Sequence, residues 1–337
     1  MDTDFKSSNS SNYSIKTLGC VLIGRNEGNR LHAAIDSIPC EILTQSVYVD
    51  SGSTDGSQEY AVKKGIHVIQ LDDTLPFTAA RARNAGAREL IKLHPTIIYI
   101  QFFDGDCSLE KGWLETAINF LENNSDVAIV CGQRKERYPH KSIYNWLCDI
   151  EWDTPIGEAE ACGGDFCARI NAFKEVSGFN PNLIAGEEPD LCYRIRRSGM
   201  SIYRLDKIMT WHDANITNFS QWFIRNVRAG YAYTELFFTY RKEKSAFRRR
   251  EFIRIISWAF VLPITTIIIT IFETKFIFTL LLYPYQIYRI RSRQNGQKRS
   301  YTYATFMVLS KFPEFFGTLK YFYQKLLNKK QEIIEYK

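Results

Sequence analysis

The sequence predicts an α/β protein with a mostly parallel sheet flanked by helices, followed by a C-terminal helical, membrane-associated extension. Three observations favour this fold class. Short apolar runs alternate with helical stretches through the first hundred residues, and strands that alternate with helices build parallel sheets. Polar residues follow each apolar run. After residue 240 the alternation gives way to basic runs and long apolar runs.

The elements of the first part follow in order. The expected strands are the apolar runs at residues 18–24, 45–50, 66–71 and 96–106. The expected helices lie between them, at residues 29–38, 57–65 and 78–93. In such sheets ligands bind outside the carboxyl ends of the strands. The polar residues that follow the strands are therefore where we expect the functional site.

The charge is divided unevenly along the chain. The 337 residues contain 43 Lys and Arg against 37 Asp and Glu, a net charge of +6. From residue 241 onward there are 19 basic and 6 acidic residues, which leaves 24 basic and 31 acidic residues in 1–240. A nucleic-acid-binding domain would carry its basic surface on the folded body. We therefore expect no nucleic-acid partner.

The extension contains an apolar hairpin, which we place at residues 253–290. Residues 255–272 are 18 residues without a charge, at the short end of the roughly 17–25 residues that span a bilayer. The second run is weaker and contains Pro284. Both outer flanks are basic, which predicts that they lie in the cytosol. We expect a membrane-associated protein with a cytosolic catalytic domain, whose hairpin either crosses twice or re-enters; a buried hairpin is the soluble alternative.

Two further segments and the cysteines complete the predicted organisation. Residues 1–17 are rich in Ser and Asn, so we expect a disordered tail and no signal peptide. The segment 301–330 mixes aromatic residues with Lys at near-helical spacing, which fits a helix in the membrane interface or one packed on the body. The eight cysteines form no CxxC pair, so we expect reduced thiols and no zinc site.

The strongest chemical signal is the acid pair in YIQFFDGDC, where Asp104 and Asp106 follow an apolar strand. Carboxylate oxygens are the ligands that Mg²⁺ prefers, and substrate phosphates complete its shell. An acid pair alone also fits a solvated turn. The acid pair is a more specific signal when it is taken together with the motifs around it. Three motifs precede it, CVLIGRNEGNRL, VYVDSGSTDGS and ARARNAGA, and two follow it, GGDFCARINAFKEVSGFN and AGEEPDLCYRIRRSG.

These six ordered motifs resemble the family 2 glycosyltransferases, which have the GT-A fold. The resemblance covers about residues 18–240 and implies a glycosyltransferase catalytic domain there, with 241–337 as its basic helical extension. The apolar hairpin resembles that of bacterial members that build cell-surface polysaccharides. The implied enzyme moves a sugar with inversion from a nucleotide-diphosphate donor, with UDP expected and GDP the alternative, to a saccharide or lipid-linked hydroxyl.

The resemblance also implies roles for individual residues. Nucleotide-sugar binding is expected from Arg25, Glu27, Asp50, Arg83, Asn84 and Asp104. Asp106 and His212 are the expected ligands of Mg²⁺ or Mn²⁺, and Gly163, Gly164 and Asp165 match the acceptor-side loop. Glu188 is the expected catalytic base, with Glu187 and Asp190 as rivals. The family usually has Glu-Asp where this chain has Glu187 and Glu188. Asp50 also fits a turn residue, and His212 a structural histidine.

Other functions remain open at this stage. A polyprenyl-phosphate glycosyltransferase uses the same donor chemistry, and a sugar-phosphate nucleotidyltransferase also needs a metal-binding acid pair. A membrane scaffold that kept the fold would need neither the acid pair nor Glu188. A dinucleotide-dependent oxidoreductase is disfavoured, because no GxGxxG follows the first strand.

Overall fold

The computed structural model describes residues 15–243 and 247–327. Most of the predicted tail, residues 1–14, lies outside the described residues, and Ile15–Thr17 form a 3₁₀ turn. The strands are β1 (Leu18–Gly24), β2 (Ser46–Asp50), β3 (His67–Gln70), β4 (Tyr99–Asp104), β5 (Cys107–Leu109), β6 (Val127–Glu136), β7 (Gly157–Glu158), β8 (Phe166–Arg169) and β9 (Ser201–His212). The helices of the sheet domain are α1 (Asn29–Asp36), α2 (Ser57–Lys63), α3 (Ala79–Leu93), α4 (Trp113–Asn123), α5 (Ile143–Trp152), α6 (Ile170–Glu175) and α7 (Glu187–Arg197).

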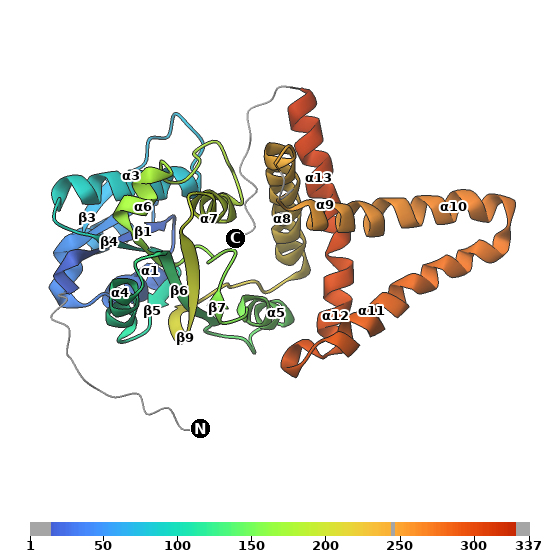
Figure 1. The fold of residues 1–337 in the computed structure, drawn as a ribbon, viewed down its shortest axis with the longest axis horizontal. Coiled ribbons are helices and arrows are strands. Elements are labelled where there is room, and N and C mark those ends of the chain that lie inside the picture. Colours follow the sequence, from blue (N-terminus) through green and yellow to red (C-terminus); the bar gives the residue numbers. More distant parts are fainter. Residues whose placement is uncertain (1–14, 244–246, 328–337) are drawn as a thin grey trace.

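One mixed sheet organises this domain, in the order β3-β2-β1-β4-β8-β6-β9-β5, with β7 beside β9. The four strands expected from the sequence, β3, β2, β1 and β4, are parallel to one another. Beyond them the pairing changes, because β8 runs antiparallel to both β4 and β6. The parallel half therefore matches the expectation, whereas the second half mixes both directions. Helices α3 and α4 lie on opposite sides of the sheet in the view of Figure 1.

The register of the parallel strands brings their carboxyl ends to one edge. Gly24 at the end of β1 pairs with Asp50 at the end of β2, and Ile23 pairs with Asp104 at the end of β4. Helix α3 packs on β1 and β2. Gly86 permits this close approach, since a Cβ there would lie 2.5 Å from a methyl carbon of Val21. The start of α3 is thereby held near the strand ends.

Three helices continue from the sheet domain: α8 (Phe219–Tyr240), α12 (Tyr301–Leu309) and α13 (Lys311–Leu326). Helix α13 packs along α8 at backbone contact distance. A Cβ at Gly230 would lie 1.9 Å from the Glu314 carbonyl oxygen, and one at Gly317 would lie 2.0 Å from that of Val227. The Thr234 and Thr318 hydroxyls share a 2.8 Å hydrogen bond across this contact. The sequence leaves two interpretations for segment 301–330, a helix in the membrane interface or one packed on the body. Its described part, residues 301–327, packs on α8.

The apolar hairpin projects away from the sheet domain (Figure 1). Its outgoing leg is one continuous helix, Arg249–Phe272, built from α9 (Arg249–Ile256), a π-helical turn (Ser257–Val261) and α10 (Leu262–Phe272). A 3₁₀ segment, Thr274–Leu281, forms the tip, and α11 (Leu282–Arg293) returns to the body. Within the described residues, Arg249–Phe272 is the one helix long and apolar enough to cross a membrane.

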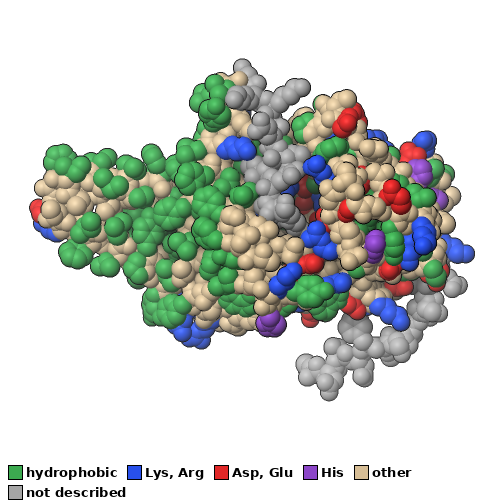
Figure 2. Space-filling view, turned by 180° about the vertical axis from the view of Figure 1, so that it is seen from behind, with side chains coloured by type: hydrophobic (Ala, Val, Ile, Leu, Met, Phe, Trp, Pro, Cys, Tyr) green, Lys and Arg blue, Asp and Glu red, His purple; other side chains and the backbone are tan. Residues whose placement is uncertain are grey.

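Hydrophobic side chains on this hairpin face outward. Figure 2 shows them covering the projecting part, whereas charged side chains gather over the sheet domain. Ile271 is 74% exposed and Phe272 84% exposed, close to the tip. Folded proteins rarely expose a contiguous apolar surface of this kind without a partner or a lipid environment. The soluble alternative, in which the hairpin is buried in the domain core, is therefore not observed in the structure.

Candidate active site

The site begins where β4 ends. Asp104 is the last residue of β4, and the N–H of Gly105 donates a 2.8 Å hydrogen bond to the Ile23 carbonyl. This bond turns the chain against the end of β1, so that Asp104 and Asp106 lie at the carboxyl edge of the sheet. Asp104 is partly exposed, and Asp106 is buried. The acid pair is therefore a fixed part of the sheet edge and not a solvated turn.

Arg83 on α3 joins the acid pair to the start of α7. One guanidinium nitrogen lies 2.6 Å from Asp104 Oδ1 and the other 2.9 Å from Glu187 Oε1. The Arg83 side chain is buried, and burial disfavours its charge; the negative charges of Asp104 and Glu187 outweigh this and raise its pKa. Two acids that lie 83 residues apart in the sequence are thus held around one fixed cation.

The loop of Gly163, Gly164 and Asp165, which is predicted to lie on the acceptor side and is called the acceptor-side loop below, passes directly against this ion pair. A Cβ on Gly164 would lie 2.7 Å from a guanidinium nitrogen of Arg83 and 3.0 Å from Asp104 Oδ2. Only glycine fits without displacing one of those groups. Gly163 beside it has a φ of +83°, a left-handed conformation that favours glycine. The expected acceptor-side glycines therefore lie against the acid pair.

A second buried cation, Arg134 on β6, also lies against the loop, since its Nη2 would be 3.4 Å from a Cβ on Gly164. Its Nη2 is 2.9 Å from Asp165 Oδ2, and Thr210 donates a 2.8 Å hydrogen bond to the same oxygen. Asp165 also accepts a 3.3 Å bond from the Asp104 backbone N–H. Burial opposes the charge of Arg134, but Asp165 and the other nearby acids raise its pKa. Asp165 is completely buried, so in this structure it positions the loop and Asp104.

Asp106 lies against His212, the last residue of β9. His212 Nε2 is 3.0 Å from Asp106 Oδ2. The antiparallel pairing of β5 with β9 places Cys107 opposite His212, so the contact is set by the sheet. The donor atoms of Asp106, Cys107 and His212 all lie within 4.8 Å of one another.

These residues fit a divalent metal ion. His212 Nε2 faces Asp106 Oδ2 at 3.0 Å, about the separation of two neighbouring ligands on one ion with bonds of about 2.1 Å, so an ion held by both residues would bind through Nε2. A carboxylate and an imidazole together suit Mn²⁺, and the carboxylate also suits Mg²⁺. The structure brings together the two residues that the sequence analysis expects as ligands. Whether they bind a metal stays a prediction.

Helix α7 presents three acids, which differ in surroundings. Glu187 contacts Arg83, as described above. Glu188 is buried, and its Oε1 accepts a 2.6 Å hydrogen bond from the Cys162 N–H at the start of the acceptor-side loop. Asp190 is completely buried and binds Arg194 and the Tyr240 hydroxyl. Glu187 and Glu188 thus adjoin the site, whereas Asp190 holds α7 to α8.

The expected nucleotide-binding residues are more dispersed. Asp50 is buried and accepts hydrogen bonds from the Tyr48 hydroxyl, the Gly52 and Ser53 N–H groups and the Gln58 amide. It orders the turn after β2 in this structure. Asn84 exchanges two hydrogen bonds with the Phe179 backbone.

The loop after β1 is more open to solvent. Arg25 lies over the Phe77 ring, and Glu27 pairs with Arg30 at 2.7 Å. Contact of Arg25, Glu27, Asp50 and Asn84 with a nucleotide stays a prediction.

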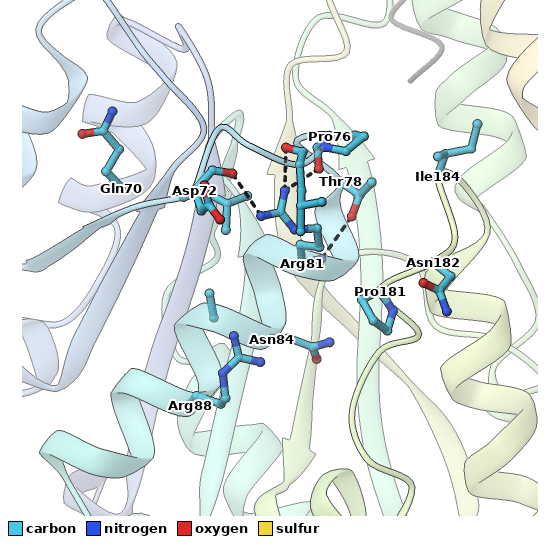
Figure 3. A pocket seen from close by; sticks show the side chains of 13 residues that line it. Gln70, Asp72, Pro76, Thr78, Arg81, Asn84, Arg88, Pro181, Asn182 and Ile184 are labelled. Carbon is cyan, nitrogen blue, oxygen red and sulfur yellow. Dashed lines mark hydrogen bonds between the residues drawn. The ribbon is translucent and has the colours of Figure 1, made fainter. Parts of the chain in front are cut away.

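A cavity of about 850 Å³ lies beside α3 (Figure 3). Its lining combines the segment after β3, the outer side of α3 and the segment before α7. Arg81 does not point into it as a free cation, because its guanidinium donates to the carbonyls of Asp72, Leu75 and Pro76. Of the expected site residues, Asn84 lines this cavity, whereas the acids do not.

Arg134 and Cys107 are the site residues that the sequence analysis does not find. Arg134 lies in the polar run QRKERY, where nothing marks it apart from Lys135 or Arg137. Its burial against Asp165 depends on the β8 pairing, which a four-residue strand does not reveal. Cys107 directly follows the acid pair, and only the β5–β9 register brings it to His212.

Comparison with known proteins identifies a family, a curated relative and solved structures to which this chain is similar. Residues 20–160 match the model of the family described as Glycosyl transferase family 2. The glycosyltransferase AglE of Haloferax volcanii is 22% identical over 203 residues, 56% of this chain and 64% of that protein. The chain thus spans somewhat less than two thirds of that relative.

Two solved structures share the fold over most of the chain. The mannosyltransferase PcManGT from Pyrobaculum calidifontis, in complex with GDP-Man and Mn²⁺, is 15% identical with a TM-score of 0.60, over 90% of this chain and 87% of that one. TarS residues 1–349 from S. aureus are 14% identical with a TM-score of 0.52, over 91% of both chains. The family match over residues 20–160, the curated relative and the shared fold agree with the arrangement of Asp104, Asp106 and α7: the chain has the GT-A fold, and its first half is similar to glycosyltransferase family 2.

Proposed function

We propose that this protein is an inverting glycosyltransferase that moves a sugar from a nucleotide-diphosphate donor to a hydroxyl of a saccharide or lipid-linked acceptor, in cell-surface polysaccharide synthesis. One observation carries the proposal: Arg83 holds Asp104 and Glu187 together, so that the acid pair after β4 and the acids that begin α7 face one site. Gly164 lies directly against this junction, because it has no side chain that would displace Arg83 or Asp104.

Asp106 and His212 would hold the divalent ion, Mg²⁺ or Mn²⁺. When bound, such an ion neutralises the charge that develops on a departing diphosphate. The PcManGT structure contains GDP-Man and Mn²⁺, which supports the same class of donor and ion here. Arg25, Glu27, Asp50 and Asn84 are proposed for the nucleotide, and Arg83 and Asp104 for the diphosphate-sugar side. UDP remains the expected nucleotide, with GDP the alternative.

Glu188 is the proposed base, and Glu187 is the rival. The Glu188 carboxylate takes the proton of the acceptor hydroxyl while that oxygen attacks the anomeric carbon. The bond from the anomeric carbon to the diphosphate oxygen breaks on the opposite face, and a single displacement inverts the configuration. The position of Glu188 beside the loop that begins at Cys162 favours this role, because a general base must lie within hydrogen-bond reach of the hydroxyl that it deprotonates.

We further propose that the apolar hairpin attaches the protein to the membrane, with the catalytic domain in the cytosol. The helix Arg249–Phe272 has 24 residues, which at 1.5 Å per residue is about 36 Å and enough to cross the hydrocarbon core. Basic residues flank the hairpin on both sides, at Arg248–Arg250 and Arg289–Arg293, and would bind anionic headgroups. This attachment favours an acceptor that is itself linked to a lipid.

The experiment is a screen of nucleotide sugars with the purified full chain in detergent, with and without Mn²⁺ or Mg²⁺. A true donor at about 100 times its dissociation constant should stabilise the protein by about 2.7 kcal/mol, and with acceptor it should release nucleoside diphosphate. Release of pyrophosphate from a sugar phosphate and a nucleoside triphosphate would instead identify a nucleotidyltransferase. Neither stabilisation nor turnover with any donor would contradict the proposal.

A further inference from the structure

We propose a second metal site, specific for a thiophilic divalent ion such as Zn²⁺, formed by Cys162, Glu188 and Cys192. We call these three residues the Cys162 cluster. Their ligand atoms all lie within 4.8 Å of one another. The two sulfur atoms are 3.4 Å apart, and Cys192 Sγ is 3.0 Å from Glu188 Oε1. Two sulfur ligands and a carboxylate form a donor set typical of Zn²⁺ rather than of Mg²⁺.

The fold positions the three ligands from two elements. Glu188 and Cys192 are four residues apart on α7 and so occupy one face of the helix. Cys162 comes from the loop before β8, and its N–H donates to Glu188. With Zn–S bonds of about 2.3 Å, tetrahedral geometry places two sulfur ligands about 3.8 Å apart. The cluster therefore has to open by only a few tenths of an ångström to enclose an ion.

Metal binding requires both thiols to lose their protons. Burial opposes this loss, because it raises the pKa of the Cys162 thiol well above its usual value and that of Cys192 to about 11, so formation of the metal–sulfur bonds has to supply the driving force. Binding replaces these two protons with one divalent cation, forming two metal–sulfur bonds and releasing the protons to solvent. The new site carries a formal charge of −1, and Arg248 lies close enough to interact with the Glu188 charge.

An ion in the Cys162 cluster would engage the carboxylate that we propose as the base. Zn²⁺ would therefore inhibit sugar transfer even when Mn²⁺ saturates the site at Asp106 and His212. This consequence rests on the proposed function, whereas the metal site itself does not. Cys162 and Glu188 each keep a little exposure, while Cys192 has none, so an ion would enter from the side of the acceptor-side loop.

Co²⁺ tests the site optically, because cobalt bound to thiolates absorbs in the near ultraviolet. The reduced full chain is titrated with Co²⁺, beside Cys162→Ser and Cys192→Ser variants. Cys107→Ser is the control for the Asp106 and His212 site, and Cys40→Ser the control for an exposed thiol. We expect one thiolate-bound Co²⁺ per chain, displaced by Zn²⁺, kept in both controls and lost in both cluster variants.

Several outcomes would overturn the site: no thiolate absorption in the reduced protein, absorption that persists in both cluster variants, or loss confined to a control. Glu188→Gln should keep the thiolate absorption and shift the visible cobalt bands; unchanged visible bands would exclude Glu188 as a ligand. This variant also decides the question if a serine variant does not fold.

Transfer assays then test the consequence separately. Zn²⁺ should lower turnover by about 10²-fold or more in wild type, the contribution of a general base. Chelation should restore it. Cobalt binding without zinc inhibition would keep the site and contradict its link to the base. If no donor supports transfer, the proposed function fails while the cobalt titration still decides the site.

Discussion

Arg83 binds Asp104 at 2.6 Å and Glu187 at 2.9 Å, and so fixes the distance between the acid pair and α7. Arg83→Met would leave two acids near each other without their cation. Removing one partner of a buried ion pair costs about 3–5 kcal/mol, and we expect about 3 kcal/mol here because Asp104 is partly exposed. Urea unfolding measures the loss.

Arg88→Met is the matched control, since Arg88 lies on the same helix and is exposed. It should change the free energy of unfolding by less than about 0.5 kcal/mol. Adding Glu187→Gln to Arg83→Met should recover part of the stability, because it removes one of the two unpaired charges. Equal stability of Arg83→Met and wild type would show that the bridge is not formed in solution.

His212→Ala should weaken Mn²⁺ binding. The imidazole lies 3.0 Å from Asp106, and loss of even a supporting residue at a metal site lowers affinity by about 10–100-fold. Isothermal titration of the full chain with Mn²⁺ measures the change. His67→Ala, on an exposed histidine of β3, is the control and should bind as wild type does. Unchanged Mn²⁺ affinity in His212→Ala would remove His212 from the proposed ligands.

Glu188→Gln should lower turnover by about 10²–10⁴-fold, because an amide cannot accept the acceptor proton. The KM for the donor should change little. Glu187→Gln is the informative comparison: as a partner of Arg83, it should affect donor binding and stability more than turnover. If the loss of turnover belongs to Glu187→Gln and not to Glu188→Gln, the base is Glu187.

The hairpin tip should govern membrane binding. Ile271→Asp together with Phe272→Asp places charges on the most exposed part of the apolar hairpin. A charged residue costs about 2.5–3.5 kcal/mol at the bilayer centre and less toward the interface, so partitioning into vesicles with anionic lipid should fall by about tenfold. Vesicle flotation measures this. Val62→Asp changes an exposed apolar residue on α2 and should float with the vesicles like wild type.

Gly317→Ala should destabilise the protein although alanine favours helices by about 1 kcal/mol. Its Cβ would lie 2.0 Å from the Val227 carbonyl oxygen, and overpacking typically costs about 1–3 kcal/mol. Thermal unfolding measures the difference. Leu319→Ala, on the exposed side of the same helix, should have a much smaller effect. A Gly317→Ala protein that melts at or above the wild-type temperature would contradict the close packing of α8 and α13.

The parallel half of the sheet is readable from the sequence, because β1, β2 and β4 are apolar runs whose ends carry polar residues. The antiparallel β8 is not: Phe166–Arg169 has only four residues, too few for a periodic pattern to stand out. The same limit hides Arg134, whose burial follows from the strands beside it. Cys162 and Cys192 are 30 residues apart, so no spacing rule joins them, and the expectation of no zinc site followed from the lack of a CxxC pair and of a histidine cluster.

The close contact between α8 and α13 affects how the protein can be shortened. The chain leaves the sheet domain through α8, forms the hairpin and returns, so that α13 covers Gly230 and Tyr231 of α8. A chain cut after residue 240, where the sequence suggests a boundary, would uncover that face to water. Excising only the outer part of the hairpin, from α10 through the 3₁₀ tip and the first turns of α11, and joining α9 to the last turn of α11 by a linker would keep the returning helices α12 and α13 in place. This is the shortened form that we expect to fold in aqueous solution.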